Sequence, residues 1–436
     1  MTKILLVPWG DPSRWGEINY CLDGDRAKSI STIKLLSKKY DKVIILSLDS
    51  LIDIKPGSGS YVYDAFKETI EKYYEEEDKN YTSIVNCVNS FVEKVVNKIG
   101  VNNVTNVVLP AYGSPGGLIS FNGKPEDYIS VGIWKIEKLL EQYSGNIEEL
   151  SLDLTTGMNF ITSLSTIMLD MIGDLELAKN DRNDHKINIR YYNSEPYNPV
   201  NSDKNYSILM VHKFIKDRLT FPYLTIHDDS QDLLKKLKQY DLPEEVKNIN
   251  SAHLGYVLST MKAVYFSIPL ALKYYVGKSV KSNILEFWEN SISVTDKSVE
   301  RNMYMNPNRV YALLYSNIIL DKVSENKSLS DIEKEVMKIY PKVNPNSMPL
   351  IHKELSNLRK AIEKLKNTNK EEEIYKNLTD FANENNNISE VPNESENKIN
   401  KRNLIAHAGF PNEFIKIFKN GTLEYTLDVG KILSTL

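Results

Sequence analysis

Short β-branched runs alternate with amphipathic stretches through roughly the first 200 residues, and this alternation is what most restricts the fold. Runs rich in Val, Ile and Leu predict strands at residues 3–7, 42–48, 106–110, 150–154 and 187–192. Stretches with apolar residues at three-to-four spacing predict helices at residues 26–40, 64–99 and 125–143. The first part of the chain is therefore expected to be an α/β domain with a parallel sheet covered by helices.

Loops rich in glycine, proline and small polar residues follow the first, third and fourth of these predicted strands. They span residues 8–16, 113–117 and 155–159. Ordinary turn chemistry explains any single loop as well as ligand binding does. Open parallel sheets bind ligands beyond the carboxyl ends of their strands, so three such loops at one edge favour a ligand site there.

The rest of the chain is expected to be all-α, apart from a strand-like run at residues 206–211. Pro269 interrupts the apolar segment 254–275, which predicts a pair of buried helices rather than a membrane span. Helices continue through residues 283–365 and include 328–340 and 348–366.

The C-terminal part combines a polar loop with a short hairpin. Asparagine and glutamate dominate residues 383–395 and predict an exposed loop or disordered insertion. Asn420-Gly421 between alternating apolar runs predicts a small β-hairpin. The expected domains are residues 1–200, a helical linker at 201–282, and a helical domain at 283–436.

Composition excludes several classes of protein. With 54 basic and 58 acidic side chains the net charge is −4, so the chain lacks the basic footprint of a nucleic-acid packaging protein and any RNA contact must be local. Cys21 and Cys87 form neither a disulfide framework nor a zinc cluster. The first apolar run stops at Pro8, before the length of a signal peptide. We expect a soluble, cytoplasmic protein.

Residues 402–407, with the sequence RNLIAH, predict a short helix that ends near Gly409 and Pro411. Asn403 and His407 share a face, which would let the amide orient the imidazole. Arg402 and His407 are five residues apart and point ~140° away from each other. One helix cannot present both side chains to one phosphate, but two copies meeting at a symmetry axis can.

Arginine and histidine together suit cleavage of RNA by its own 2′-hydroxyl. Imidazole serves as the base for the 2′-oxygen or the acid for the 5′-oxygen, and guanidinium stabilises charge on the phosphorane. No metal is needed for this chemistry. The competing interpretation is that Arg402 lies on a solvated helix face and His407 is a capping residue.

The combination resembles the ribonucleases of type III CRISPR defence that join a CRISPR-associated Rossmann-fold (CARF) sensor to a HEPN nuclease domain. Their R-polar-x3-H motif matches Arg402, Asn403 and His407. Their sensor loops match residues 8–16 and 154–159. The resemblance spans nearly the whole chain and implies a Rossmann-like sheet followed by a helical nuclease domain.

The resemblance also implies how such a protein works. A cyclic oligoadenylate, of which cyclic tetra-adenylate is the favoured ring, binds between two sensor domains of a homodimer, which then cuts single-stranded RNA. Glycines would bring backbone amides close to its phosphates, threonines and asparagine would donate or accept hydrogen bonds, and either tryptophan would stack on adenine or pack internally. The candidate ligand-binding residues are Trp9, Gly10, Pro12, Trp15, Gly113, Ser114, Gly116, Thr155, Thr156, Gly157 and Asn159.

Alternatives remain open at this point. One is a transcriptional regulator that links the sensor to a helical DNA-binding module, which would not need Arg402 and His407. Another is a sensor that degrades its own activator through Thr155 or Thr156. The chain lacks the G-x-G-x-x-G and P-loop motifs of dinucleotide oxidoreductases and ATPases. His352 and Arg359, two turns apart on one predicted helix face, either border an RNA groove or are surface residues.

Overall fold

The chain folds into two compact units. The computed structural model describes residues 2–75, 79–143, 145–157, 159–197, 204–220, 244, 247–248, 251, 253–278, 284–303, 305–375, 401–412, 414–434 and 436. Unit 1 comprises Met1–Asn180, His185–Thr220 and Ser282–Tyr311. Unit 2 comprises Asp181–Asp184, Phe221–Lys281 and Ala312–Leu436. The loop predicted at 383–395 lies outside the described residues.

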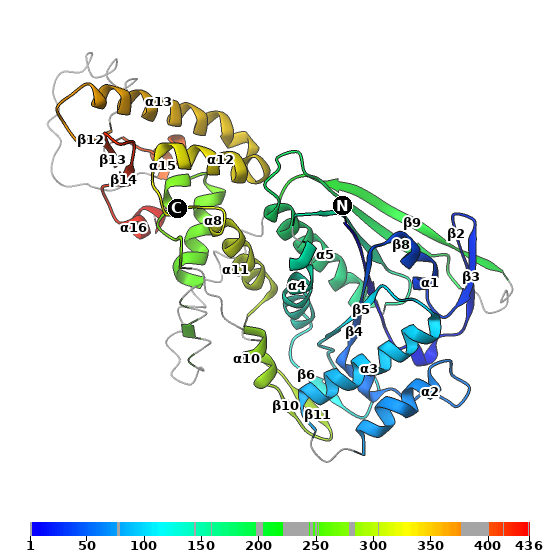
Figure 1. The fold of residues 1–436 in the computed structure, drawn as a ribbon. Helices are drawn as coiled ribbons and strands as arrows, with labels where there is room; N and C mark the ends of the chain where they lie inside the picture. The colour runs from blue at the N-terminus through cyan, green and yellow to red at the C-terminus, as the bar shows by residue number, and fades with distance from the viewer. Residues whose placement is uncertain are drawn as a thin grey trace. The chain divides into compact units, whose positions relative to one another are not determined.

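Unit 1 is built on an eight-stranded sheet with the order β3-β2-β9-β8-β7-β1-β4-β5 (Figure 1). Its strands are β1 (Thr2–Pro8), β2 (Ile18–Leu22), β3 (Asp25–Ser29), β4 (Lys42–Leu48), β5 (Val104–Leu109), β7 (Ile147–Asp153), β8 (Ile187–Ser194) and β9 (Asn205–Lys216). The strands from β8 to β5 are all parallel, which confirms the predicted parallel sheet. β9 runs antiparallel to β8, so the complete sheet is mixed.

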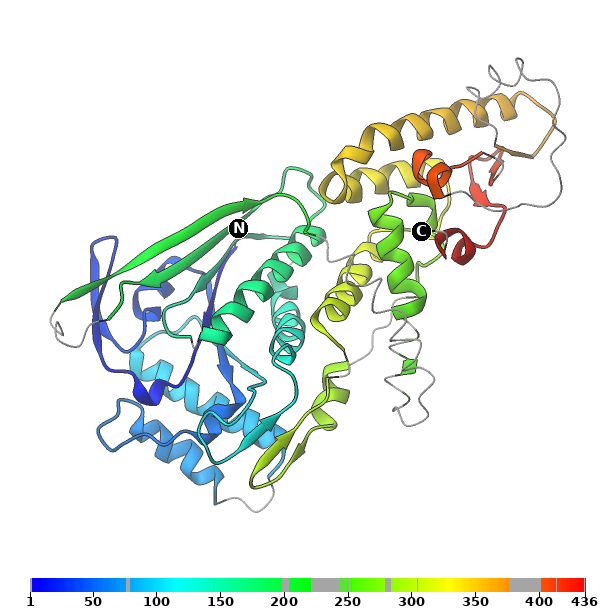
Figure 2. The same ribbon diagram turned by 180° about the vertical axis from the view of Figure 1, so that it is seen from behind.

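Helices cover both faces of this sheet, as Figures 1 and 2 show. They are α1 (Ile33–Leu36), α2 (Tyr63–Phe66), α3 (Tyr81–Ile99), α4 (Asp127–Leu140) and α5 (Asn159–Lys179). α1 and α3 lie on one face, and α4 packs beside α5 on the other. The inner strands are therefore buried on both sides, which explains their unbroken apolar runs.

The parallel strands have the order β5-β4-β1-β7-β8, and the connections change direction between β1 and β7. In such doubly wound sheets the loops that leave these two strands diverge and form a crevice at the carboxyl edge. The sequence thus folds into a sheet with a ligand crevice beside Pro8 and Asp153.

Two predicted helices differ in the structure. Residues 26–29, expected to be helical, instead form β3, which pairs with β2 in a hairpin. Asp23 and Gly24 make the turn, with φ of 50° and 94°, a combination that favours Asp-Gly. The predicted helix 64–99 is divided, because the Asn80 side chain caps a new helix, α3, through the Ser83 amide.

A second small sheet adds a distant segment to unit 1. It consists of β6 (Ser120–Asn122), β10 (Ser293–Val294) and β11 (Ser298–Glu300), and α10 (Ile284–Asn290) precedes it. β11 pairs with β6 across the sequence separation. Residues 282–311 therefore group with the N-terminal unit, so the compact units do not follow the boundaries expected at 200 and 282.

Unit 2 is helical, with one small sheet. Its helices are α8 (Leu258–Tyr265), α9 (Pro269–Leu272), α11 (Pro307–Leu320, which begins in unit 1), α12 (Leu329–Val343), α13 (Met348–Lys366), α15 (Lys401–Ala406) and α16 (Val429–Ser434). The chain turns between α8 and α9 at Ser267, with φ of 59°, two residues before Pro269, and both helices are largely buried. The expected buried helix pair is confirmed, and no helix among the described residues is long and apolar enough to cross a bilayer.

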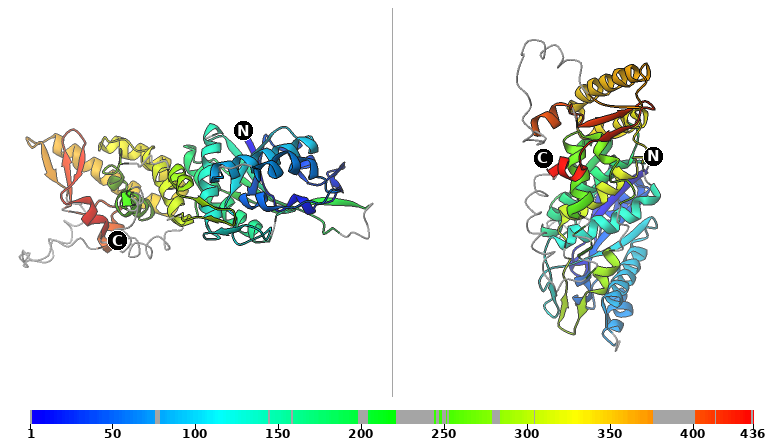
Figure 3. Two further views of the ribbon diagram at one scale, coloured as in Figure 1. Left: turned by 90° about the horizontal axis from the view of Figure 1, so that it is seen from below. Right: turned by 90° about the vertical axis from the view of Figure 1, so that its left-hand side faces the viewer.

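The predicted C-terminal hairpin is also confirmed. β13 (Ile415–Phe418) pairs with β14 (Leu423–Tyr425), and β12 (Glu372–Ile374) adds a third strand that the sequence did not predict. This sheet lies beside α13 (Figure 3). Gly421 has φ of 88°, as an Asn-Gly turn requires.

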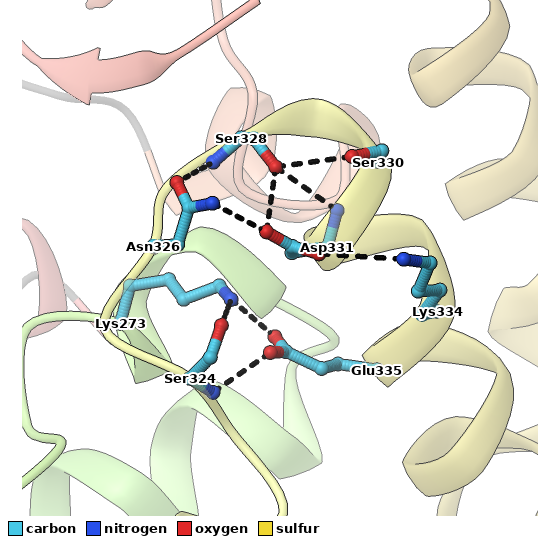
Figure 4. Close-up of polar contacts among 8 residues, drawn as sticks. All are labelled: Lys273, Ser324, Asn326, Ser328, Ser330, Asp331, Lys334 and Glu335. Atoms are coloured by element: carbon cyan, nitrogen blue, oxygen red, sulfur yellow. Dashed lines mark hydrogen bonds and ion pairs between the residues drawn. The ribbon is translucent and has the colours of Figure 1, made fainter.

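Side chains fix the start of α12, as Figure 4 shows. Ser328 caps the helix by accepting a hydrogen bond from the Asp331 amide at 3.2 Å. Glu335 lies 2.5 Å from the buried Lys273 ammonium and also accepts a hydrogen bond from the Ser324 amide. The Glu335 carboxylate therefore has a cation and a backbone donor as partners.

Candidate functional site

A cavity of about 500 Å³ opens at the carboxyl edge of the sheet in unit 1. Its walls come from the segments that follow β1, β4, β5 and β7. The lining residues are Gly10, Asp11, Ser13, Arg14, Trp15, Leu48, Ser50, Leu51, Asp53, Ile54, Lys55, Pro115, Gly116, Thr156 and Gly157. The crevice lies where the doubly wound topology predicts it.

The structure brings part of the predicted ligand set to this cavity. Gly10, Trp15, Gly116, Thr156 and Gly157 line it. The other predicted residues do not line it or are not described there: Trp9, Pro12, Gly113, Ser114, Thr155 and Asn159. The first residue of α5 is Asn159, whose side chain lies outside the described atoms.

The two tryptophans have different environments. Trp9 is fully buried, and its ring packs edge-on against Trp15 with centroids 5.4 Å apart and an interplanar angle of 86°. Of the two expected roles, Trp9 therefore has that of a packing residue, and it does not line the cavity. Trp15 is half-buried and lines the cavity, so its ring is the one available to a base.

Two glycines are required by close packing around the cavity. A Cβ atom on Gly116 would lie 2.1 Å from the Asp53 carbonyl oxygen. A Cβ atom on Gly157 would lie 2.5 Å from Cγ2 of Thr162 in α5. Side chains at either position would displace neighbouring atoms, so both loops stay open only with glycine.

Thr155 stabilises its loop through hydrogen bonds and does not line the cavity. Its hydroxyl donates to Asp153 at 2.6 Å and accepts from the Ser194 amide at 3.0 Å. Asp153 also accepts a hydrogen bond from Thr32, and burial raises the pKa of this carboxyl above its usual range. These bonds hold the end of β7, so Thr156 is the threonine that lines the cavity.

The sequence did not predict several lining residues after β4. The buried carboxylate of Asp53 accepts hydrogen bonds from the Leu118 and Ile119 amides through Oδ2, at 3.0 and 3.1 Å. Its Oδ1 is buried and has no hydrogen-bond partner among the described residues. Lys55 and Arg14 add exposed cations at the wall. Asp53 and Lys55 lie between a buried parallel strand and the turn residues Pro56-Gly57, and that position was the available signal.

The RNLIAH motif forms the end of a short helix in unit 2. Leu404 is buried, whereas Arg402 and Asn403 are exposed on α15. The chain then turns at Gly409, with φ of 77°, whose amide donates to the Leu404 carbonyl at 2.8 Å. A Cβ atom on Gly409 would lie 2.3 Å from Ile268. The predicted helix stop at this glycine is confirmed.

The imidazole of His407 has a partner that the sequence did not indicate. Its Nδ1 lies 3.3 Å from Oε1 of Glu354 on α13. The Asn403 side chain makes no hydrogen bond among the described residues, and its backbone carbonyl accepts from the His407 amide. The structure therefore shows Glu354, and not the Asn403 amide, beside the imidazole, and a role of Asn403 in orienting the ring stays a prediction.

That His352 and Arg359 border an RNA groove stays a prediction. His352 and Arg359 are exposed on α13, and Arg359 lies 2.5 Å from Glu333 on α12. Over the described part of the chain, no three His, Cys, Asp or Glu residues are grouped so that they could hold a metal ion.

Comparisons with known proteins match both parts of the chain. A family model for the CARF domain of CRISPR system endoribonuclease Csx1 matches residues 4–196, and a model for the HEPN domain of the same family matches residues 344–427. CRISPR system endoribonuclease Csx1 of Methanocaldococcus jannaschii is 27% identical over 464 aligned residues, which cover 97% of this chain and 89% of that protein. The first match contains the cavity, and the second contains Glu354 and the motif.

Proposed function

Because the chain belongs to the Csx1 family of CRISPR-associated proteins, in which a CARF domain precedes a HEPN domain, we propose that it is an endoribonuclease switched on by a cyclic oligoadenylate. The observation that carries the proposal is the geometry of His407. Its side chain is 27% exposed and is held from the buried side by Glu354. An imidazole that is held at one nitrogen and is partly exposed to solvent can exchange a proton with an RNA oxygen.

The cleavage chemistry follows from the two side chains of the motif. The exposed guanidinium of Arg402 can neutralise a phosphorane, and His407 can move a proton to or from the 2′- or 5′-oxygen. The RNA supplies its own nucleophile, so the reaction proceeds without a metal and leaves a 2′,3′-cyclic phosphate. Single-stranded RNA is the substrate, since its 2′-oxygen can rotate in line with the leaving group.

The cavity of unit 1 supports binding of a cyclic oligoadenylate, with cyclic tetra-adenylate favoured. Trp15 offers a stacking surface for adenine, and Lys55 offers positive charge to phosphates. Arg14 is paired with Asp11 at 3.1 Å and can contact a phosphate only by sharing its guanidinium with that carboxylate. The loop at Thr156 leads directly into α5, whose N-terminal amides attract anions. About 500 Å³ holds part of such a ring, which fits a ring shared by two copies of the chain.

A homodimer also resolves the geometry of the motif. Arg402 and His407 diverge on one helix, so a two-fold axis that pairs two copies of α15 would place two guanidinium groups and two imidazoles in one cleft. Ligand bound between paired sensors would then act on the nuclease by changing this pairing.

The test is RNA cleavage by Arg402→Ala and His407→Ala at saturating cyclic tetra-adenylate. Each variant is expected to lose on the order of 10²–10⁴ in rate, because a positioned acid–base or charge-stabilising group is removed. Activator binding should stay within about twofold of wild type, since the cavity lies in unit 1. Retention of more than about a tenth of wild-type activity by either variant would contradict the assignment.

A further inference from the structure

Glu354 is a buried acidic residue without an ordinary counter-ion. Its side chain is 1% exposed, and its Oε1 lies 3.3 Å from Nδ1 of His407. Its Oε2 is buried and has no hydrogen-bond partner among the described residues. The imidazole is therefore the one charged or polar group that the described structure offers to this carboxylate.

The neighbouring helix offers a useful comparison. Glu335 on α12 is 12% exposed, yet it has the Lys273 ammonium and the Ser324 amide as partners (Figure 4). Burying a carboxylate is unfavourable unless a cation or several donors compensate. Glu335 has a cation and a backbone donor as partners, whereas Glu354 has only the imidazole of His407 among the described residues. Because burial of the Glu354 carboxylate is unfavourable for the free energy of folding, its position points to a role at the imidazole of His407.

We propose that Glu354 is the positioning residue of the nuclease, which accepts a hydrogen bond from Nδ1–H of His407 and fixes the ring with Nε2 as its reactive nitrogen. This inference rests on the proposed catalytic role of His407. An ionised carboxylate can only accept hydrogen bonds, so in this arrangement the 3.3 Å contact has the proton on Nδ1. The lone pair of the neutral ring is then on Nε2, the nitrogen that Glu354 does not contact.

The arrangement serves both protonation states of His407. In the neutral state Nε2 accepts the proton of an RNA hydroxyl, and the ring cannot rotate away because Nδ1 is held. In the cationic state Nε2 donates a proton to a leaving oxygen, while the nearby carboxylate stabilises the positive charge. α13 thereby fixes a side chain that lies 53 positions later in the chain.

Glu354→Gln removes the charge and keeps the shape of the side chain. We expect kcat to fall about 10- to 100-fold, as for other residues that orient a reactive histidine, while KM for RNA and the half-saturating concentration of cyclic tetra-adenylate stay within about twofold. Glu354→Asp, which retains the charge, should recover part of the loss. Glu335→Gln is the matched control: it removes a largely buried carboxylate from the same unit and should leave kcat within about threefold of wild type.

A second measurement does not depend on activity. In protein labelled with ¹⁵N-histidine, the resonances of His407 are identified by their loss in His407→Ala. At a pH where the ring is neutral, wild type should show the Nδ1–H tautomer, and Glu354→Ala should shift it toward the Nε2–H form that free histidine prefers. An Nε2–H tautomer in wild type, or a kcat of Glu354→Gln within about twofold of wild type, would overturn the proposal.

Different results would contradict the proposed nuclease mechanism and the proposed role of Glu354. Full activity of His407→Ala would remove the proposed nuclease mechanism, whatever tautomer the ring adopts. Loss of activity in His407→Ala together with full activity in Glu354→Gln would leave the nuclease intact and remove only the role of Glu354.

Discussion

Replacing Arg301 by methionine tests how the segment 282–311 is held in unit 1. The guanidinium is 1% exposed and lies 2.6 Å from Asp49, which is itself fully buried after β4. It also donates to the Ala111 carbonyl. Asp49 accepts further hydrogen bonds from the Ala111 amide and the Tyr81 hydroxyl. Methionine retains most of the volume but leaves the Asp49 carboxylate without its cation.

The expected loss is large because the remaining charge has no access to water. Removing one partner of a buried ion pair costs about 3–5 kcal/mol. For a unit of this size, with a urea dependence near 3 kcal/mol per molar, the unfolding midpoint should fall by roughly 1 to 1.7 M. Arg301→Met/Asp49→Asn removes both charges and should recover more than about half of this loss.

The direction of the pH dependence follows from Asp49. Burial raises the pKa of this carboxyl above 3.8, and Arg301 is the largest influence that lowers it. Removing Arg301 raises the folded-state pKa further, so the ionised carboxylate opposes folding more strongly as the pH rises above the unfolded value. The stability deficit of Arg301→Met should therefore be larger at pH 8 than at pH 5.

Intrinsic tryptophan fluorescence reports on the correct part of the chain. All four tryptophans belong to unit 1: Trp9, Trp15, Trp134 and Trp288. Urea unfolding followed by this signal thus measures the unit that contains Arg301 rather than an average over two units. A midpoint within about 0.3 M of wild type, or a deficit that grows toward acid pH, would refute the reasoning.

Two further predictions concern the ligand and the assembly. Gly157→Asp should raise the half-activating concentration of cyclic tetra-adenylate by about tenfold or more, because the new side chain crowds Thr162 and adds negative charge at the cavity. The control Gly255→Asp, at an exposed glycine outside the cavity, should leave this concentration unchanged. Equal dose-response curves for the two variants would place the activator elsewhere. In the second experiment, wild-type chains are mixed with an excess of Arg402→Ala/His407→Ala chains, and subunit exchange is verified by mass. RNA cleavage per wild-type chain should then fall. Constant activity would mean that each chain carries a complete site.

Local sequence signals predicted the parallel strands, the break before Pro269 and the Asn-Gly hairpin, since each depends on neighbouring residues. The β2–β3 hairpin had such a signal too. Asp23-Gly24 lies between two short runs and favours a tight turn, but the spacing of apolar residues in 26–40 suggested a helix. Pairing in the mixed sheet outweighed that local preference.

Contacts between distant segments could not be predicted in this way. β11 joins β6 by pairing Glu300 with Asn122, and no local pattern marks that partner. The cavity glycines were recognisable, and the segment after β4 carries a similar signal at Pro56-Gly57, but the contact of Asp53 with the Leu118 and Ile119 amides joins segments that are distant in the sequence. In the sequence, Glu354 is one of several charged residues on the amphipathic helix α13, and only the fold brings it close to His407.

The most direct test of the central claim is RNA cleavage by the purified chain in excess EDTA, with and without cyclic adenylates of three, four and six units. The account predicts that single-stranded RNA is cut only when a ring is present, most strongly with cyclic tetra-adenylate, and that the products end in 2′,3′-cyclic phosphate. RNA with 2′-O-methyl groups should resist. Cleavage that no ring accelerates, or that stops on chelation, would contradict the account.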